Sequence, residues 1–126
     1  MKYKKIYEYI PYLEKLENTD DGYNFISKES TPLLTFDQEI ITLREDLYNE
    51  GVIHQDYNKI LKDYYGDRNI KTLKDEDVKK APTIVVEALI SNIIKQDRFV
   101  EGLLISCLKN GSLLFLIKEL KNREED

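Results

Sequence analysis

The chain has 126 residues, a formal net charge of −5, and hydrophobic and charged fractions of 41% and 34%. This length and composition are typical of one folded, well-solvated domain, which we expect over residues 1–126. A net acidic chain is a poor match for nucleic acid, because proteins that bind phosphate usually present a basic face.

The first segment predicts an amphipathic helix, because apolar side chains recur at spacings of three and four residues. Pro11 lies inside this pattern and lacks the amide hydrogen that a continuous helix needs. Two alternatives stay open: the helix kinks at Pro11, or a second helix starts with Pro11 in its first turn. The apolar positions are Tyr3, Ile6, Tyr7, Ile10, Leu13 and Leu16.

Residues 18–35 are the least helical stretch of the sequence. Acidic residues followed by Gly22 predict a turn at 20–22, and residues 23–26 predict an extended segment. At most a short extended or hairpin segment is therefore expected near residues 19–34. A capping box of Thr35 and Gln38 is expected to start the next helix, and Gly51 to end it.

The middle of the chain predicts one further helix and a polar connection. Asp56 is a suitable helix start and Gly66 a suitable stop. Residues 67–82 are polar, with one short helical turn expected around residues 75–80. Pro82 then marks a break.

The last third is expected to form the centre of the core. An apolar stripe runs from Ile84 to Ile94, a second apolar helix is expected over residues 99–108, and a third contains Leu113 and Leu120. The sequence thus predicts a mainly α fold, a compact helical domain of about five to seven helices.

The same third carries a resemblance. The run from Gln96 to Gly102, the pair Asn110-Gly111 and the closing leucine-rich helix resemble the C-terminal signature of a bacterial family of domains of unknown function. Members of that family read D-R-F-x-E-G-H, where this chain has Leu103 in place of the histidine. The resemblance implies a small helical domain and no established activity.

One group of charged residues is a candidate for binding or catalysis: Asp97, Arg98 and Glu101. On a continuous helix they share a face, where two carboxylates beside a guanidinium could bind a charged ligand or form an acid–base pair. The structural alternative is a helix break, with Asp97 as a cap, Arg98 paired with Glu101, and Gly102 allowing helices to approach closely.

The tyrosines suggest a second candidate surface. The chain has nine tyrosines and no tryptophan, and every tyrosine precedes residue 66. Tyrosine is enriched at interfaces, which makes Tyr9, Tyr12 and Tyr57 candidates for binding a partner. The alternative is that these rings cover the core with their hydroxyls in solvent.

No catalytic residue, metal site or cofactor is predicted. His54 is the only histidine and is expected in an exposed loop, without further residues to complete a metal site. Cys107 is the only cysteine and lies in an apolar run, as expected for a buried thiol in a cytoplasmic protein. No apolar run is long enough to span a membrane.

Three functional classes remain. A non-enzymatic protein-interaction module, which could be a homodimer, ranks first, because no catalytic constellation is complete. A small-ligand-binding protein or enzyme with a site around Asp97, Arg98 and Glu101 is the alternative. A nucleic-acid-associated regulator ranks third.

Overall fold

The fold is mainly helical with one antiparallel hairpin, as predicted. The structure is a computed structural model that describes residues 1–28, 31–100 and 102–125. Within these ranges no helix combines the length and the apolar content that crossing a membrane requires. The elements in chain order are α1 (Lys4–Tyr7), α2 (Ile10–Leu16), β1 (Tyr23–Lys28), β2 (Thr31–Phe36), α3 (Gln38–Asn49), α4 (Tyr57–Tyr65), the 3₁₀ turn η1 (Ile70–Thr72), α5 (Asp75–Lys79), α6 (Thr83–Gln96), α7 (Leu103–Lys109) and α8 (Ser112–Glu125).

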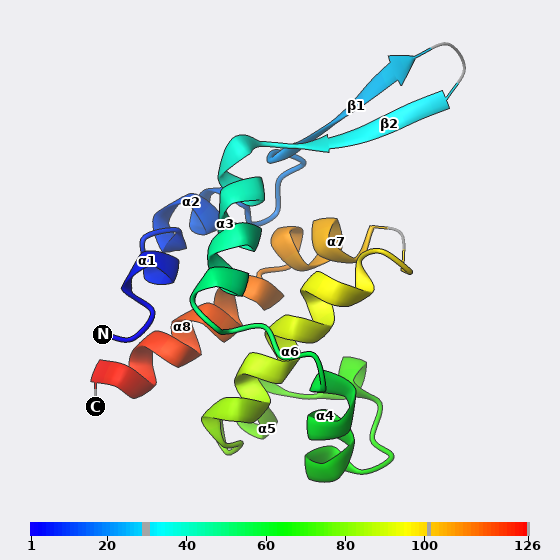
Figure 1. Ribbon diagram of the computed structural model, residues 1–126. Coiled ribbons are helices and arrows are strands. Elements are labelled where there is room, and N and C mark those ends of the chain that lie inside the picture. Colours follow the sequence, from blue (N-terminus) through cyan, green and yellow to red (C-terminus); the bar gives the residue numbers. More distant parts are fainter. Residues whose placement is uncertain (29–30, 101, 126) are drawn as a thin grey trace.

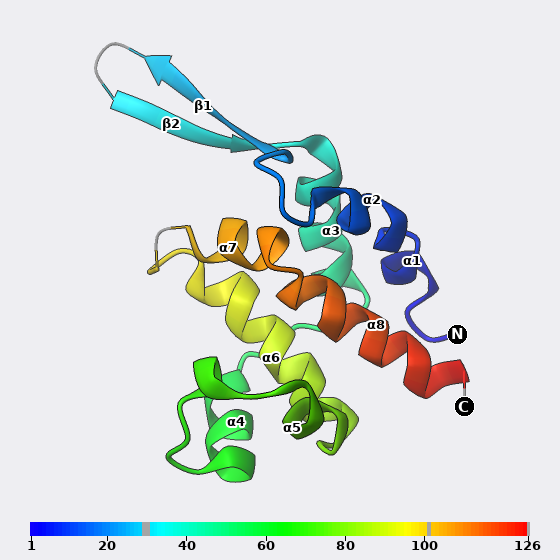
Figure 2. The same ribbon diagram turned by 180° about the vertical axis from the view of Figure 1, so that it is seen from behind.

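Helix α6 lies at the centre of the arrangement. It packs against α4 on one side and against α7 and α8 on the other, while α1 contacts both α3 and α8. Both views show the β1–β2 hairpin projecting away from the helices, and the two chain ends lying close together (Figures 1 and 2). The hairpin pairs Tyr23 with Phe36 at its base.

The structure decides between the two alternatives at Pro11. Helix α1 ends at Tyr7, and α2 starts at Ile10 with Pro11 in its first turn. Proline is favourable there, because the first amides of a helix have no partner within the helix. All six apolar positions predicted for this segment are buried.

Helix α3 ends as predicted but starts differently. Thr35 lies in β2, and its hydroxyl donates to the carbonyl of Asn24 across the hairpin at 3.2 Å, so the predicted capping box is wrong. Because Thr35 is paired within β2, it is not available to cap α3, which begins at Gln38. At the other end Gly51 adopts a φ of +82°, and the Val52 amide donates to the Leu47 carbonyl at 3.0 Å, which closes the helix.

The core draws on the whole chain rather than on the last third alone. Among the described residues, half of the largest fully buried side chains come from the part of the chain before residue 67, where the polar middle stretch begins. These side chains are Ile6, Leu13, Ile40, Leu43, Leu47, Val52, Val86, Ile90, Leu104, Leu113, Ile117 and Leu120.

The predicted helix over residues 99–108 starts later than expected. Helix α7 begins at Leu103, and Phe99 is 73% exposed. Gly102 precedes the helix with a φ of +78°, a left-handed conformation that interrupts a continuous helix. The apolar residues before it therefore lie on the surface.

Candidate functional site

A groove runs along one face of α6. Its volume is about 670 Å³, within the range of about 300–1,000 Å³ typical of ligand sites. The η1–α5 segment lies on one side of α6, and α7 and α8 lie on the other (Figure 2). We call this the α6 groove. Its floor is formed by Leu89, Asn92, Ile93 and Gln96, which follow one another on one face of the helix.

The walls of the α6 groove are mainly apolar. The η1–α5 side contributes Ile70, Leu73 and Val78. The opposite side is formed by Val100, Leu103, Cys107, Phe115 and Leu116. Val100 is 44% exposed and continues the apolar surface out of the groove toward Phe99.

Neutral polar side chains also line the groove: Asn92 and Gln96 are half-buried, whereas Asn58 and Asn110 are exposed. Within the described ranges, Asn58 and Asn92 make no hydrogen bond through their side chains. Gln96 is oriented by Tyr57, because its Nε2 donates to the tyrosine hydroxyl and its amide oxygen stays available. Asn110 accepts the Ser112 amide through Oδ1 at 2.8 Å, which leaves its NH₂ group available. The groove thus offers both donors and acceptors.

The charged side chains that line the groove all lie on its η1–α5 side. They are Lys71, Lys74 and Asp75, and all three are exposed. Neither lysine forms an ion pair in the part of the chain that the structure describes. Among the lining residues, this side therefore carries two lysines against one aspartate, although the chain is acidic as a whole.

Cys107 lies in the groove wall and is 8% exposed. Burial, followed by the nearby negative charge of Asp97, raises the pKa of the thiol to about 11. The thiol is therefore protonated at neutral pH and is a weak nucleophile. This placement agrees with the sequence prediction of a buried cysteine.

Asp97 and Arg98 lie just beyond α6, and Glu101 lies outside the described residues. The Oδ1 atom of Asp97 accepts the backbone amide of Leu104 at 2.9 Å and so caps the start of α7. Arg98 is exposed, with its guanidinium 5.5 Å from the centre of the Phe99 ring. Neither lines the groove, although their neighbours Gln96 and Val100 do.

Gly102 has a different role from the predicted one. A Cβ atom added there would meet nothing within 4 Å, so close helix approach is not its function. Its φ of +78° is what requires glycine.

Tyr9 and Tyr12 use their hydroxyls inside the fold. The hydroxyl of Tyr9 donates to Asp46 at 2.7 Å, and that of Tyr12 donates to Asp37 at 3.0 Å. These bonds connect α2 and the residue before it to α3 and to Asp37, which precedes α3. Burial and the neighbouring carboxylates raise the pKa of both phenols. Of the three candidate tyrosines, Tyr57 alone contacts a groove residue through a hydrogen bond that the structure describes.

A second polar cluster was missed by the sequence reasoning. Glu87 is only 7% exposed and accepts hydrogen bonds from Tyr3 at 2.7 Å and His54 at 2.8 Å. Ser91 accepts the His54 backbone amide at 2.9 Å. The side chain of His54 is 26% exposed, less than the predicted exposed loop implied. The signal was present, since Glu87 and Ser91 are polar residues within an apolar helical stripe.

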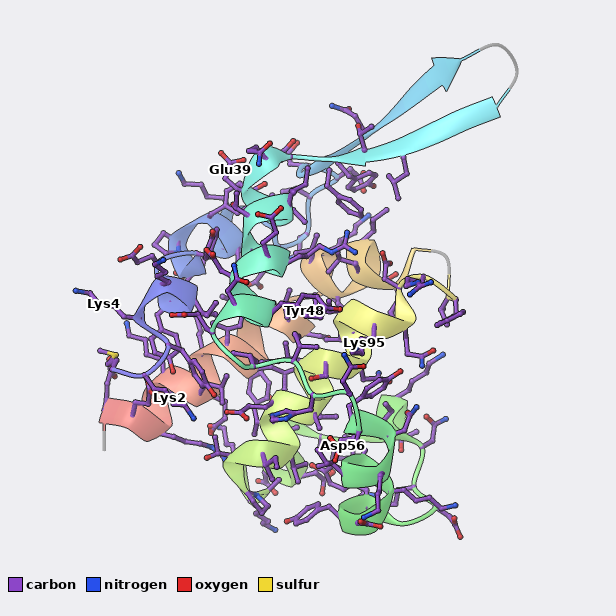
Figure 3. The ribbon with its side chains drawn as sticks, in the orientation of Figure 1. Lys2, Lys4, Glu39, Tyr48, Asp56 and Lys95 are labelled. Atoms are coloured by element: carbon purple, nitrogen blue, oxygen red, sulfur yellow. The ribbon has the colours of Figure 1, made fainter. Side chains whose placement is uncertain are left out.

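Lys95 on α6 contacts both α3 and the segment between α3 and α4. Its ammonium lies 5.7 Å from the centre of the Tyr48 ring and donates to Gln55 at 3.1 Å (Figure 3). In the described ranges, no group of three or more His, Cys, Asp and Glu side chains is arranged to hold a metal ion.

Comparison with known families gives one match. A model described as a family of unknown function (DUF6508) matches residues 1–126, which confirms the expected family of unknown function. No curated protein and no solved structure matches the chain.

Proposed function

The chain belongs to DUF6508, a family of unknown function, and we propose that it is a non-enzymatic protein-interaction module that receives part of a partner protein in the α6 groove. The observation that carries this proposal is the lining of the groove. Apolar walls supply the driving force for association, and amide side chains with unused hydrogen-bonding groups supply direction. Such amides are costly to bury unless a ligand bonds to them.

The reactive side chains nearest the groove support a binding role over catalysis. Cys107 is protonated at neutral pH because burial raises the pKa of its thiol to about 11. Ser106 and Ser112 also line the groove, and within the described ranges neither hydroxyl is hydrogen-bonded to a side chain that could act as a base. None of these side chains is prepared to attack a substrate.

The exposed apolar residues beside the groove support a macromolecular partner. Phe99 and Val100 are 73% and 44% exposed and continue the apolar lining onto the surface. A ligand confined to the groove would leave them in water, whereas a protein partner would cover them. The single cysteine is consistent with a place for this interaction in a reducing cytoplasm.

The experiment compares two matched substitutions. Asn92 lines the groove floor, whereas Asn122 is exposed on α8 and away from the groove. Asn92→Trp fills the groove, and Asn122→Trp adds the same ring to open surface. Displayed random peptides are selected on the parent chain, and the affinity of the selected peptides is then measured for each variant.

We expect Asn92→Trp to weaken binding at least about tenfold, because the ring occupies the site, and Asn122→Trp to bind like the parent. Equal affinity of the two variants would mean that the groove is not the binding site. Failure to select any peptide on the parent chain would remove the protein-interaction function itself.

A further inference from the structure

We infer that the α6 groove recognises an extended peptide through its backbone, with a carboxylate of the peptide placed beside Lys71 and Lys74. This inference rests on the proposed function and names the kind of partner segment. Three observations lead to it: the order of side chains along α6, the free amide groups, and the position of the charges.

The first observation is the order of side chains on the groove floor. Apolar and amide side chains alternate from Leu89 through Asn92 and Ile93 to Gln96. At 1.5 Å per residue this stretch is about 10 Å long, which matches roughly three residues of an extended chain. An extended peptide likewise alternates, since its side chains are separated by peptide groups that need hydrogen bonds.

The second observation concerns hydrogen-bonding capacity. The side chains of Asn58 and Asn92 make no hydrogen bond in the described parts of the chain, and Gln96 and Asn110 each keep one end of the amide available. A side-chain amide carries one donor group and one acceptor, as a peptide group does. Free amides in a groove are therefore complementary to an extended backbone, which presents its N–H and C=O groups outward.

Two other occupants fit these amides less well. A helix satisfies its own backbone groups, so it has none to offer along its length. A fatty-acid chain would remove the amides from water and give them no partner, a cost without a compensating bond. The extended peptide is the occupant that uses both the apolar and the amide parts of the lining.

The third observation is the position of two lysines, which predicts the charge of the peptide. Lys71 and Lys74 lie on the η1–α5 side of the groove and form no ion pair among the described residues, with only Asp75 beside them in the lining. A carboxylate on the peptide would complement these two lysines. The carboxylate can be an Asp or Glu side chain or the C-terminus of the partner, and both present the same group.

The charge is tested by reversing it. Peptides displayed with either end free are selected on the parent chain, on the double variant Lys71→Glu/Lys74→Glu, and on the control Lys59→Glu/Lys62→Glu. The control makes the same charge change on α4 at exposed residues outside the groove lining. We expect the parent and the control to enrich peptides with a carboxylate, and the groove variant to bind these peptides about tenfold more weakly and to enrich basic ones.

The arms of the selection identify the source of the carboxylate. Enrichment of Asp or Glu within the peptide indicates a side chain, whereas enrichment only among peptides with a free C-terminus indicates the terminal group; either result supports the inference. If the Lys71→Glu/Lys74→Glu variant enriched the same acidic peptides as the parent chain, the placement of the carboxylate beside these lysines would be wrong. The proposed function would still stand if Asn92→Trp blocked those peptides.

The backbone contact is tested with Asn92→Leu and with laurate as the competing ligand. Leucine keeps the volume and removes the amide, so we expect peptide binding to fall about fivefold to tenfold and laurate binding to rise. Methylating successive backbone nitrogens of a selected peptide should weaken binding at the positions that face the amides. Tighter binding of laurate than of any peptide to the parent chain, or full tolerance of backbone methylation, would overturn the extended peptide as the occupant.

Discussion

The imidazole Nε2 of His54 lies 2.8 Å from the Oε1 of Glu87, and this contact fastens the segment between α3 and α4 to the middle of α6. The other oxygen of the same carboxylate accepts the Tyr3 hydroxyl at 2.7 Å. Three distant segments of the chain therefore meet at one side chain that is almost fully buried. A buried carboxylate is tolerated in such a place because both of its oxygens have donors.

Substitution of Glu87 should be among the more damaging changes in the protein. Glu87→Ala leaves the Tyr3 hydroxyl and the His54 ring without their acceptor, and we expect a loss of roughly 3 kcal/mol in the free energy of unfolding. Glu87→Gln keeps one acceptor and should cost about half as much. Urea unfolding measures both, with the exposed Glu45→Ala as the control. Equal stability of the alanine variant and the parent would contradict a structural role for this cluster.

The sequence was sufficient for features that depend on local chemistry. The apolar spacing of the first segment, the positive-φ stop at Gly51, and the break at Pro82 all follow from rules that act over a few residues. Thr35 was misassigned because strand pairing, a contact between distant residues, overrides a local capping signal. The α6 groove and the pair His54–Glu87 depend on which elements pack together, and spacing along one helix does not contain that information.

Asp97 and Arg98 are adjacent, yet we expect them to differ in their effect on stability. Asp97→Ala removes the acceptor for the Leu104 amide at the start of α7 and should cost about 1 kcal/mol. Arg98→Ala changes an exposed side chain that lies over the Phe99 ring, so the loss should stay below about 0.5 kcal/mol. Thermal unfolding of both variants measures the contrast. A larger loss for Arg98→Ala would mean that the turn after α6 is held by the guanidinium instead.

Gly102 should be replaceable by asparagine more easily than by alanine. Its φ of +78° is unfavourable for residues with a side chain, while an added Cβ meets no atom within 4 Å. Gly102→Ala should therefore cost about 1 kcal/mol through backbone strain alone, and Gly102→Asn less, because asparagine tolerates the left-handed region. Chemical unfolding of the two variants measures the difference. If asparagine cost more than alanine, lack of space would be the cause rather than backbone conformation.

The buried tyrosines should make the protein sensitive to alkaline pH. Burial, followed by a neighbouring carboxylate, raises the pKa of Tyr3, Tyr7 and Tyr12 above the ordinary value. Above about pH 10 the unfolded chain releases these protons first, so the stabilisation is complete below that pH and is lost as the pH rises toward the folded-state values. Because the chain has no tryptophan, tyrosinate absorbance and helical circular dichroism can follow the transition together.

Tyr7→Phe distinguishes this mechanism from general alkaline damage. The Tyr7 hydroxyl is buried near the Glu124 carboxylate, but the two do not meet hydrogen-bond geometry, so removal of the hydroxyl should change stability at neutral pH little. The alkaline midpoint should move to higher pH, because one buried ionisable group is gone. A midpoint identical to that of the parent would show that Tyr7 does not contribute to the transition.

Arg123 near the end of α8 should stabilise the fold more than its position near the chain end suggests. Its guanidinium donates to the carbonyl of Ala81 at 2.6 Å, and to those of Val78 and Lys79 at 3.0 and 3.2 Å. The Val78 and Lys79 carbonyls belong to the last turn of α5 and Ala81 follows that helix, in a region where carbonyls lack the partners of a helix interior. Arg123→Ala should therefore cost roughly 2–3 kcal/mol, as for hydrogen bonds that involve a charged group.

The comparison with Arg123→Lys separates geometry from charge. Lysine keeps the positive charge near Glu119, which lies 3.9 Å from the Arg123 Nε, but its ammonium cannot reproduce the planar fork that reaches several carbonyls at once. We expect Arg123→Lys to recover less than half of the lost stability in urea unfolding, with exposed Asn122→Ala as the control. Full recovery by lysine would mean that charge alone holds α8 against α5. In that case raising the salt concentration should destabilise the parent chain, whereas bonds to neutral carbonyls depend little on salt.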